Sequence, residues 1–338
     1  PGLSCKSPVL GGTLAACYNR SGMNMRVCVL GNPVLDHVLA VERLPVRAGE
    51  HQEIRDYRVG PGGAANVLIA GARLGVAMQA LGVVGDDQAG HDLVECLSGE
   101  GIDTSVIVRS ANGSTPSIFI LVAPDGSVSS MGRHGRRPGM ALPEAWPPAI
   151  AASAALYCDG WAHSSLGGEL VLAVAQHATT AGVPVFFDPG PRSGLLPGEW
   201  LEEMLHHVTV LSLTEDEARA ISPPDVTDVE TLARVLHERG PRWVIVKRGA
   251  RGCVIHDGVE TVVRPAFIVP VCDTTGAGDA VAAALIFAWL RGYDRGTTAA
   301  LVNAAGALAV QQLGAGLHMP TANQMRRILE SAGITGVV

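Results

Sequence analysis

The sequence predicts a three-layer α/β fold, in which helices cover both faces of a mostly parallel central sheet and a small β-sheet is added to it. Strand-like and helix-like segments alternate from residue 25 onward, and the strand-like segments are continuously apolar. Glycine (41 residues) and alanine are abundant, which suits helices packed closely on a sheet. At 338 residues the chain is long enough for one large α/β domain, alone or with a small appendage.

The expected elements follow one another along the chain. The β-rich run Met25–Leu30 ends at Gly31 and predicts the first strand, with helices at 64–74 and 90–98 and a strand at 77–84. In the middle of the chain, apolar runs predict strands at 155–158, 183–187, 208–211 and 243–247. Helices are expected between and after them at 168–180, 201–207, 214–221 and 229–239. The last third predicts helices at 276–291, at 297–312 and from Thr321.

Two stretches interrupt this order, residues 44–59 and 117–131. Both show alternation or hairpin character, and Asp125-Gly126 is a turn signal between two β-rich runs. We interpret them as strands of a small β-layer that could close over a substrate and exclude water. An ordinary edge hairpin is the alternative. We expect residues 25–330 to form the domain, with an N-terminal extension at 1–24 and a C-terminal tail at 331–338.

Composition excludes several classes of protein. The net charge is −7 and no run is rich in lysine or arginine, which argues against a nucleic-acid partner. The longest apolar run, residues 280–290, is shorter than the about 20 residues that a membrane-spanning helix needs. Seven scattered cysteines without a Cys-x-x-Cys pair indicate reduced thiols, and therefore a cytoplasmic protein.

The strongest motif is the segment 273–279, which reads Asp-Thr-Thr-Gly-Ala-Gly-Asp and precedes an alanine-rich helical run. Small residues at a helix start leave backbone N–H groups unpaired and let a phosphate approach closely. A carboxylate beside an anion site would be repelled unless it has a role, and accepting a proton from a substrate hydroxyl is such a role for Asp279. A glycine-rich turn capped by an aspartate is the alternative.

A second segment, residues 60–66, reads Gly-Pro-Gly-Gly-Ala-Ala-Asn and opens a helix. Gly62 and Gly63 expose backbone to a ligand, and Asn66 offers a donor and an acceptor to hydroxyls. The glycine spacing fits the dinucleotide motif imperfectly, and residues 53–59 before it are not a buried apolar strand. A dehydrogenase is therefore a poor interpretation.

With both segments in place, the chain resembles the ribokinase-like (PfkB) family of carbohydrate kinases over roughly Met25 to Leu329. Gly75 and Gly85 follow Asn66 at the expected distances, and Leu68 departs mildly from the first signature. The resemblance implies an ATP-dependent kinase that uses Mg²⁺. It further implies that Gly276, Ala277 and Gly278 form an anion hole and that Asp279 is the catalytic base. The residues it implies for the sugar site are Asp36, Gly62, Gly63 and Asn66.

Further positions match family segments less closely. Arg192 could contact phosphate or an acidic substrate group, or form a structural ion pair with Asp188. The family's Asn-x-x-Glu motif, which organises magnesium and phosphates, corresponds to Thr214 and Glu217. Thr214 thus stands in place of asparagine, and Glu217 is expected to hold magnesium through water. A helix capping box explains the same two residues.

The resemblance also implies a nucleotide site and a site for a monovalent cation. Besides Thr214, the residues implied for the nucleotide are Lys247, Gly249, Gly252 and Asn303. Asp273 and Thr275 fall where many members place a potassium-type ion. Lid strands often pair into homodimers in relatives, so a homodimer is expected here.

The resemblance favours phosphorylation of a hydroxyl of a sugar or sugar acid. A nucleoside kinase of the same fold is one alternative, although an aromatic content of only 4 % favours a sugar. A catalytically silent ligand-binding member is another alternative. Thr214 supports that interpretation, whereas Asp279 and the intact anion turn oppose it.

Overall fold

A computed structural model describes residues 26–133 and 140–338, so the extension expected at 1–24 lies outside the described residues. Within them the main sheet has eight strands in the order β14-β13-β12-β11-β10-β9-β1-β4. Strands β12 to β4 of that order are parallel, and β13 and β14 extend one edge as an antiparallel pair. The strands are β1 Arg26–Leu30, β4 Ala77–Leu81, β9 Ala155–Asp159, β10 Val185–Asp188, β11 Val210–Thr214, β12 Trp243–Lys247, β13 Cys253–His256 and β14 Thr261–Arg264.

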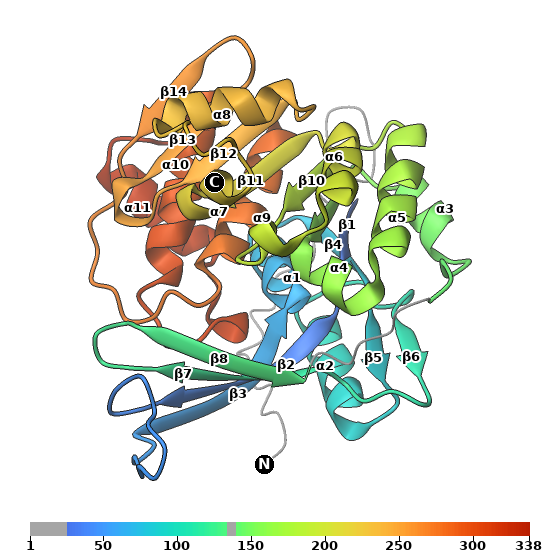
Figure 1. Ribbon diagram of the computed structural model, residues 1–338, viewed down its shortest axis with the longest axis vertical. Coiled ribbons are helices and arrows are strands. Elements are labelled where there is room, and N and C mark those ends of the chain that lie inside the picture. The colour runs from blue at the N-terminus through green and yellow to red at the C-terminus, as the bar shows by residue number, and fades with distance from the viewer. Residues whose placement is uncertain (1–25, 134–139) are drawn as a thin grey trace.

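Helices cover both faces of this sheet, as the sequence predicts (Figure 1). One face carries α1 (Ala64–Arg73), α9 (Ala277–Arg291), α10 (Arg295–Ala309) and α11 (Ala322–Ser331), with α2 (Gln88–Gly99) beside α1. The other face carries α3 (Trp146–Ala151), α4 (Gly160–Leu166), α5 (Gly168–Thr180), α6 (Gly198–His207), α7 (Glu215–Ala220) and α8 (Val229–Glu238). Short 3₁₀ turns lie at Ser193–Leu195 (η1), Gly249–Arg251 (η2) and Gly316–His318 (η3).

The two helical layers explain why the central strands are mostly apolar. Along β1, Val27 and Val29 belong to one core, whereas Cys28 and Leu30 belong to the other. Successive side chains of a strand point to opposite faces, so a strand covered on both sides favours apolar residues on both.

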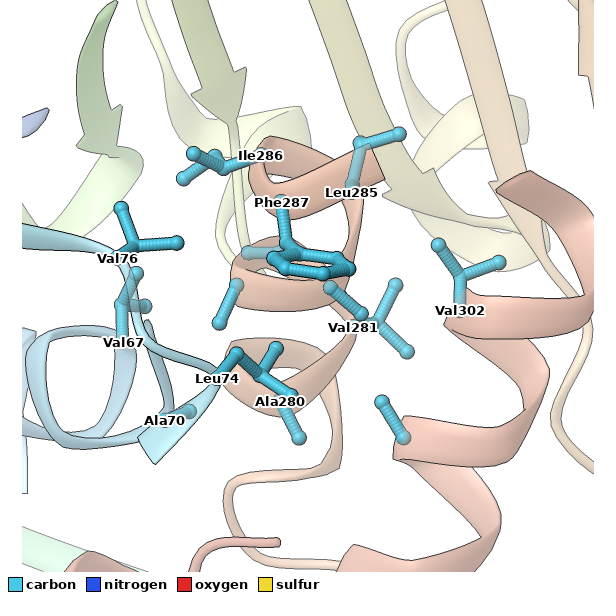
Figure 2. Close-up of a cluster of buried hydrophobic side chains, with 14 of the residues drawn as sticks. Val67, Ala70, Leu74, Val76, Ala280, Val281, Leu285, Ile286, Phe287 and Val302 are labelled. Carbon is cyan, nitrogen blue, oxygen red and sulfur yellow. The ribbon is translucent and has the colours of Figure 1, made fainter. Parts of the chain in front are cut away.

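Helices α1 and α9 pack directly against each other, as Figure 2 shows for Val67 and Ala70 of α1 and Ala280 of α9. Residues 280–284 of α9 are four alanines and one valine, all of them buried, which lets neighbouring helices come close. This packing fixes the start of α1 against the start of α9, although the two lie far apart in the sequence.

A separate four-stranded sheet, called here the small sheet, projects from the main body at the lower side of Figure 1. Its order is β3-β2-β7-β8, with β2 pairing antiparallel to β3 and parallel to β7. Its strands are β2 Pro33–Ala40, β3 Asp56–Gly63, β7 Ser117–Val122 and β8 Val128–Arg133. Two further short strands, β5 (Val83–Gly85) and β6 (Val108–Ser110), form a parallel pair.

Several expected boundaries are wrong. The lid strand expected at 44–59 is a strand only from Asp56, because the chain before it makes a turn in which the Glu50 amide donates to the Arg47 carbonyl. Strand β2 was not expected, since polar Asp36 and His37 interrupt its apolar run. The strand expected at 77–84 is two strands, β4 and β5, in different sheets.

The end of the chain joins the core. In the segment expected as a tail, Ile334, Val337 and Val338 pack against the main cluster. The Tyr293 hydroxyl donates to the Val337 carbonyl at 2.9 Å. Among the helices in the described ranges, none is long and apolar enough to cross a membrane.

Candidate active site

Four neighbouring strands of the main sheet end in polar residues at the same edge. Their last residues are Asp159 (β9), Asp188 (β10), Thr214 (β11) and Lys247 (β12). The strand register places Asp159 beside Asp188 and Thr214 beside Lys247. Ligands of open parallel sheets bind in the crevice outside the carboxyl ends of the strands, so this edge is the place to look for a site.

The first of two cavities at this edge has a volume of about 370 Å³ and lies between the main and small sheets; we call it the lid cavity. Apolar side chains of the small sheet, among them Val34 and Ile118, form one wall. The polar and charged side chains that line it are Asn32, Asp36, Asn66, Ser130, Asp159, Ser165, Arg192, Thr275 and Asp279. A mainly polar floor under an apolar cover suits a small molecule rich in hydroxyls.

The second cavity, about 460 Å³, lies between α9, α10 and the segments around 249–253 and 266–271; we call it the helix cavity. Its walls are largely apolar, with Phe267 and Val302 among them. All five residues expected at the nucleotide line it: Thr214, Lys247, Gly249, Gly252 and Asn303. The Asn303 amide donates to the Pro265 carbonyl at 3.0 Å and so holds the 265–271 segment over the cavity.

The glycine-rich turn at the start of α9 is the partition between the two cavities. Gly276 and Asp279 line the lid cavity, whereas Ala277 and Gly278 line the helix cavity. Gly276 has a φ of 74°, and a methyl group there would lie 2.5 Å from the Ala315 Cβ, so only glycine fits. No side chain caps this helix start. The Ala277 N–H donates to the Thr274 carbonyl at 3.2 Å, so an anion would meet chiefly the other N–H groups of this first turn and the helix dipole.

Asp279 faces the lid cavity from the first turn of α9. Its Oδ2 accepts a hydrogen bond of 2.8 Å from the Asn66 amide, whose own oxygen accepts from the Gly316 N–H at 2.9 Å. Burial raises the pKa of Asp279 to about 7, the Asn66 hydrogen bond opposes this, and the Asp188 charge adds to it. A carboxyl with a pKa near neutrality suits proton transfer at physiological pH.

Asp36 lies on β2 and is only 6 % exposed. Burial and the charge of Asp279 raise its pKa to about 7. A methyl group at Gly62, on the neighbouring strand, would lie 1.8 Å from Asp36 Oδ2. Gly62 does not line the lid cavity, in contrast to Gly63 and Asn66, so its absent side chain makes room for Asp36 and not directly for a ligand.

With this geometry in view, the similarity to known proteins can be stated. A family model described as pfkB family carbohydrate kinase matches residues 24–322. The chain belongs to the pfkB family.

Individual relatives agree with that membership. An ATP-dependent ribose-1-phosphate kinase of Halopiger xanaduensis is 32% identical, over 90% of this chain and 98% of its own length. A ribokinase of Bacillus subtilis is 29% identical, over 90% of this chain and 99% of its own length. The structure of Arabidopsis thaliana ribokinase complexed with ribose and ATP has a TM-score of 0.76 at 25% identity, over 90% of this chain and 98% of that one. This pfkB protein is thus an ATP-dependent kinase that phosphorylates a hydroxyl of a sugar or nucleoside.

Two further residues of this pfkB kinase lie in the lid cavity and were missed by the sequence analysis. Asp159 accepts from the Ala162 N–H at 2.8 Å, and burial together with the charges of Asp279 and Asp188 raises its pKa to about 7. A signal for it existed, because it directly follows an apolar strand. Asn32 accepts from the Val83 N–H at 2.9 Å, and its buried Nδ2 has no partner in the part of the chain that the structure describes.

The departure from the family motif at Thr214 has a structural consequence. Thr214 and Glu217 form the capping box of α7: the Thr214 N–H donates to Glu217 Oε2 at 2.6 Å and the Glu217 N–H to Thr214 Oγ1 at 3.3 Å. Burial and then the Asp188 charge raise the pKa of Glu217. Glu217 lines neither cavity. It would therefore contact a metal in one of them only through a bridging water, or after the start of α7 has moved.

The arrangement fits magnesium carried by a nucleotide better than magnesium bound by the protein alone. Within residues 26–133 and 140–338, no three His, Cys, Asp or Glu side chains gather as metal ligands would. Mg²⁺ usually binds through one or two carboxylates plus substrate phosphates and water. Asp188 and Glu217, close enough to interact electrically, could supply those carboxylates.

Of the two residues expected at a monovalent cation, Asp273 forms hydrogen bonds with backbone N–H groups and with the other residue, Thr275. Asp273 is fully buried; its Oδ1 accepts from the Thr275 N–H and hydroxyl at 2.9 and 2.8 Å, and its Oδ2 from the Gly314 N–H at 2.8 Å. These bonds join the turn before α9 to the loop at 313–316. Thr275 lines the lid cavity and Asp273 lines neither.

The structural alternative for Arg192, an ion pair with Asp188, is wrong. Asp188 Oδ2 instead accepts from Lys247 Nζ at 2.5 Å. Lys247 approaches from β12, next but one in the sheet, whereas Arg192 lies on the wall of the lid cavity.

Proposed function

We propose that this protein transfers the terminal phosphoryl group of ATP to a hydroxyl of a sugar or sugar acid, with Asp279 as the general base. The observation that carries the proposal is the partition: one turn presents a carboxyl with a raised pKa to the lid cavity and glycine backbone to the helix cavity. An acceptor in one cavity and a nucleotide in the other would then meet across that turn.

The residues of the turn have two different roles in the proposed reaction. Asp279 accepts the hydroxyl proton as the new oxygen–phosphorus bond forms, and the N–H groups at Gly276, Ala277 and Gly278 stabilise the charge on the phosphoryl oxygens. Magnesium, when bound with the nucleotide, supplies positive charge at the phosphates. The apolar cover of the small sheet excludes water from the acceptor.

The lining of the lid cavity favours a sugar over a nucleoside. Asp36, Asn66 and Asp159 offer hydrogen-bonding groups for hydroxyls. Trp161 is the one aromatic side chain among the described residues that line this cavity, which leaves little surface on which a base could stack. The names of the two relatives, a ribokinase and a ribose-1-phosphate kinase, support a pentose, free or phosphorylated, as the first acceptor to test.

Phosphoryl transfer from ATP should be measured against pentoses, hexoses, their phosphates, sugar acids and nucleosides. We expect turnover with at least one sugar or sugar derivative, and a fall in kcat by about 10²–10⁴-fold in Asp279→Asn. Turnover with nucleosides alone would support the nucleoside alternative. Ligand binding without any turnover would support a silent member, and an Asp279→Asn variant with nearly full activity would contradict the role of Asp279.

We also infer a homodimer through the outer face of the small sheet. That face exposes Tyr57 by 46%, Phe119 by 43% and Met131 by 60%, and the His37 ring stacks on Phe119 at 4.5 Å between centroids. Isolated apolar side chains are common on surfaces, but a cluster of this kind suits a partner. Light scattering should give twice the chain mass, and Phe119→Lys should give the monomer mass.

Two smaller proposals remain. Among the described residues no cysteine forms a disulfide, and four of the five cysteines there are buried, which supports a cytoplasmic location. A monovalent cation near Asp273 and Thr275 would make kcat higher in K⁺ than in tetramethylammonium at equal ionic strength, and equal rates in both salts would exclude it.

A further inference from the structure

Lys247 occupies an unusual place for a buried charge. It is the last residue of β12, its side chain is 13% exposed, and it lines the helix cavity. Its Nζ donates to Asp188 Oδ2 at 2.5 Å, and Asp188 Oδ1 in turn accepts from the Gly190 N–H at 3.1 Å. The ammonium is therefore held by a carboxylate that is itself fixed to its own loop.

The ammonium also lies beside the partition. A methyl group built on Gly278 would lie 3.5 Å from Lys247 Nζ. Among the described residues outside that helix turn, no other atom would lie within 4 Å of this methyl group. A group that enters the helix cavity and approaches the Gly278 backbone meets the ammonium first.

The carboxyl groups around Lys247 favour a cation at its position. Asp188, Glu217 and Asp279 all act electrically on Lys247. A phosphoryl group passing the partition would otherwise face these carboxyls with only the helix start in its favour.

We propose that Lys247 is a catalytic residue whose ammonium contacts the transferring phosphoryl group beside Gly278, and that Asp188 is the positioning residue that holds the ammonium there. This inference rests on the proposed function. The bond from phosphorus to the nucleotide oxygen breaks as the bond to the acceptor oxygen forms, and the hydroxyl proton goes to Asp279. Lys247 keeps its protons throughout and stabilises negative charge on the phosphoryl oxygens.

A purely structural role for Lys247 would be to neutralise the buried Asp188. Removing one partner of a buried pair leaves an uncompensated charge, whereas removing both does not. The two roles therefore differ in the double variant Lys247→Met with Asp188→Asn, which has neither the ammonium nor the charge that it would neutralise.

The test measures kcat, the KM values and the melting temperature of Lys247→Met, Asp188→Asn and the double variant. We expect kcat to fall by about 10²–10³-fold in Lys247→Met and to stay as low in the double variant, with the acceptor KM within about threefold of wild type. Asp188→Asn keeps the Lys247 ammonium, so its kcat should fall less than that of Lys247→Met. Arg239→Met, which breaks the half-buried pair with Glu202 away from both cavities, is the matched control, with kcat within about twofold of wild type.

Recovery of kcat in the double variant to within about fivefold of wild type would overturn the inference, and so would a similarly small loss in Lys247→Met. If Lys247→Met alone does not fold, the double variant, which lacks both members of the ion pair, decides by the same limits. Failure of the proposed function looks different, because wild type itself would then transfer phosphate to no sugar or sugar derivative.

Discussion

At the scale of single residues, the lid cavity combines three carboxyls, the buried Asp36 and the half-buried Asp159 and Asp279, whose pKa values are all raised to about 7. Burial is the largest cause for each, and the charge of Asp279 adds to the other two. Their protonation is therefore coupled, and a change at one carboxyl is felt by its neighbours.

The first prediction concerns the pH dependence of the rate. The base must be ionised, so kcat/KM for the acceptor should rise with pH and level off above about 7. Asn66→Ala removes a hydrogen bond to the ionised form of Asp279, which raises the pKa of Asp279 and moves this rise to higher pH. Initial rates across the pH range measure the midpoint. An unchanged midpoint in Asn66→Ala would show that another group controls the profile.

The second prediction concerns the pH dependence of stability. Asp36 has a folded-state pKa of about 7, above its usual 3.8, so between these values the folded protein holds a proton that the unfolded chain has lost. The contribution of Asp36 to stability is therefore fully present at low pH and falls as the pH rises through this window, by on the order of a few kcal/mol for a fully buried group. Asp36→Asn should make the urea midpoint drop less between about pH 5 and about pH 7.5 than it does in wild type. An equal drop in both proteins would contradict this.

The third prediction separates two neighbouring glycines. A methyl group at Gly62 would collide with the Asp36 carboxyl, whereas one at Gly60 would have no neighbour within 4 Å. Gly62→Ala should raise the acceptor KM by about tenfold or more and lower stability by about 1–3 kcal/mol, while Gly60→Ala stays close to wild type. Kinetics and thermal melting of both variants measure this, and equal effects at the two positions would refute it.

At the scale of elements, the capping box of α7 gives the fourth prediction. Thr214→Val removes the cap and should cost about 1 kcal/mol, and Thr321→Val, in the equivalent box of α11, should cost a similar amount. Thr214 also lines the helix cavity, so Thr214→Val alone should change the KM for ATP. If both variants leave that KM unchanged, Thr214 acts only as a helix cap.

The central strands and the long helices could be predicted because their signals are local. An apolar run such as 243–246 is buried on both faces and has few alternatives. The small sheet was harder to predict. Its strand β2 carries two polar residues, Asp36 facing the lid cavity and His37 on the outer face, and they break the apolar pattern of a strand. The pairing of β2 with β7 joins strands about eighty residues apart, which no local pattern reveals.

At the scale of the whole molecule, the site depends on contacts between distant segments. Asn66 and Asp279 are 213 residues apart in sequence and meet because α1 packs on α9. The two glycine-rich segments were found separately in the sequence, but their contact and the shared partition are properties of the fold. Asp159 was missed for the same reason, because only the sheet brings the ends of β9, β10, β11 and β12 together.

The fifth prediction tests the assignment of the two cavities to two ligands. A ligand that binds only the folded state stabilises it by about 2.7 kcal/mol at a hundred times its Kd. Ala307→Trp fills part of the helix cavity and should abolish the rise in melting temperature caused by a non-hydrolysable ATP analogue with Mg²⁺. The rise caused by the acceptor should persist. Loss of the acceptor effect alone would reverse the assignment.

The thinness of the partition has a consequence for inhibition. Because one turn of α9 separates the two cavities, a conjugate of adenosine and a sugar joined by a short phosphate chain would place one end in each. Once one end is bound, the other is held near its cavity at an effective concentration in about the millimolar range, so the conjugate binds about 10²–10⁴-fold more tightly than either half. Selectivity among kinases with similar nucleotide cavities would then come from the half that enters the lid cavity.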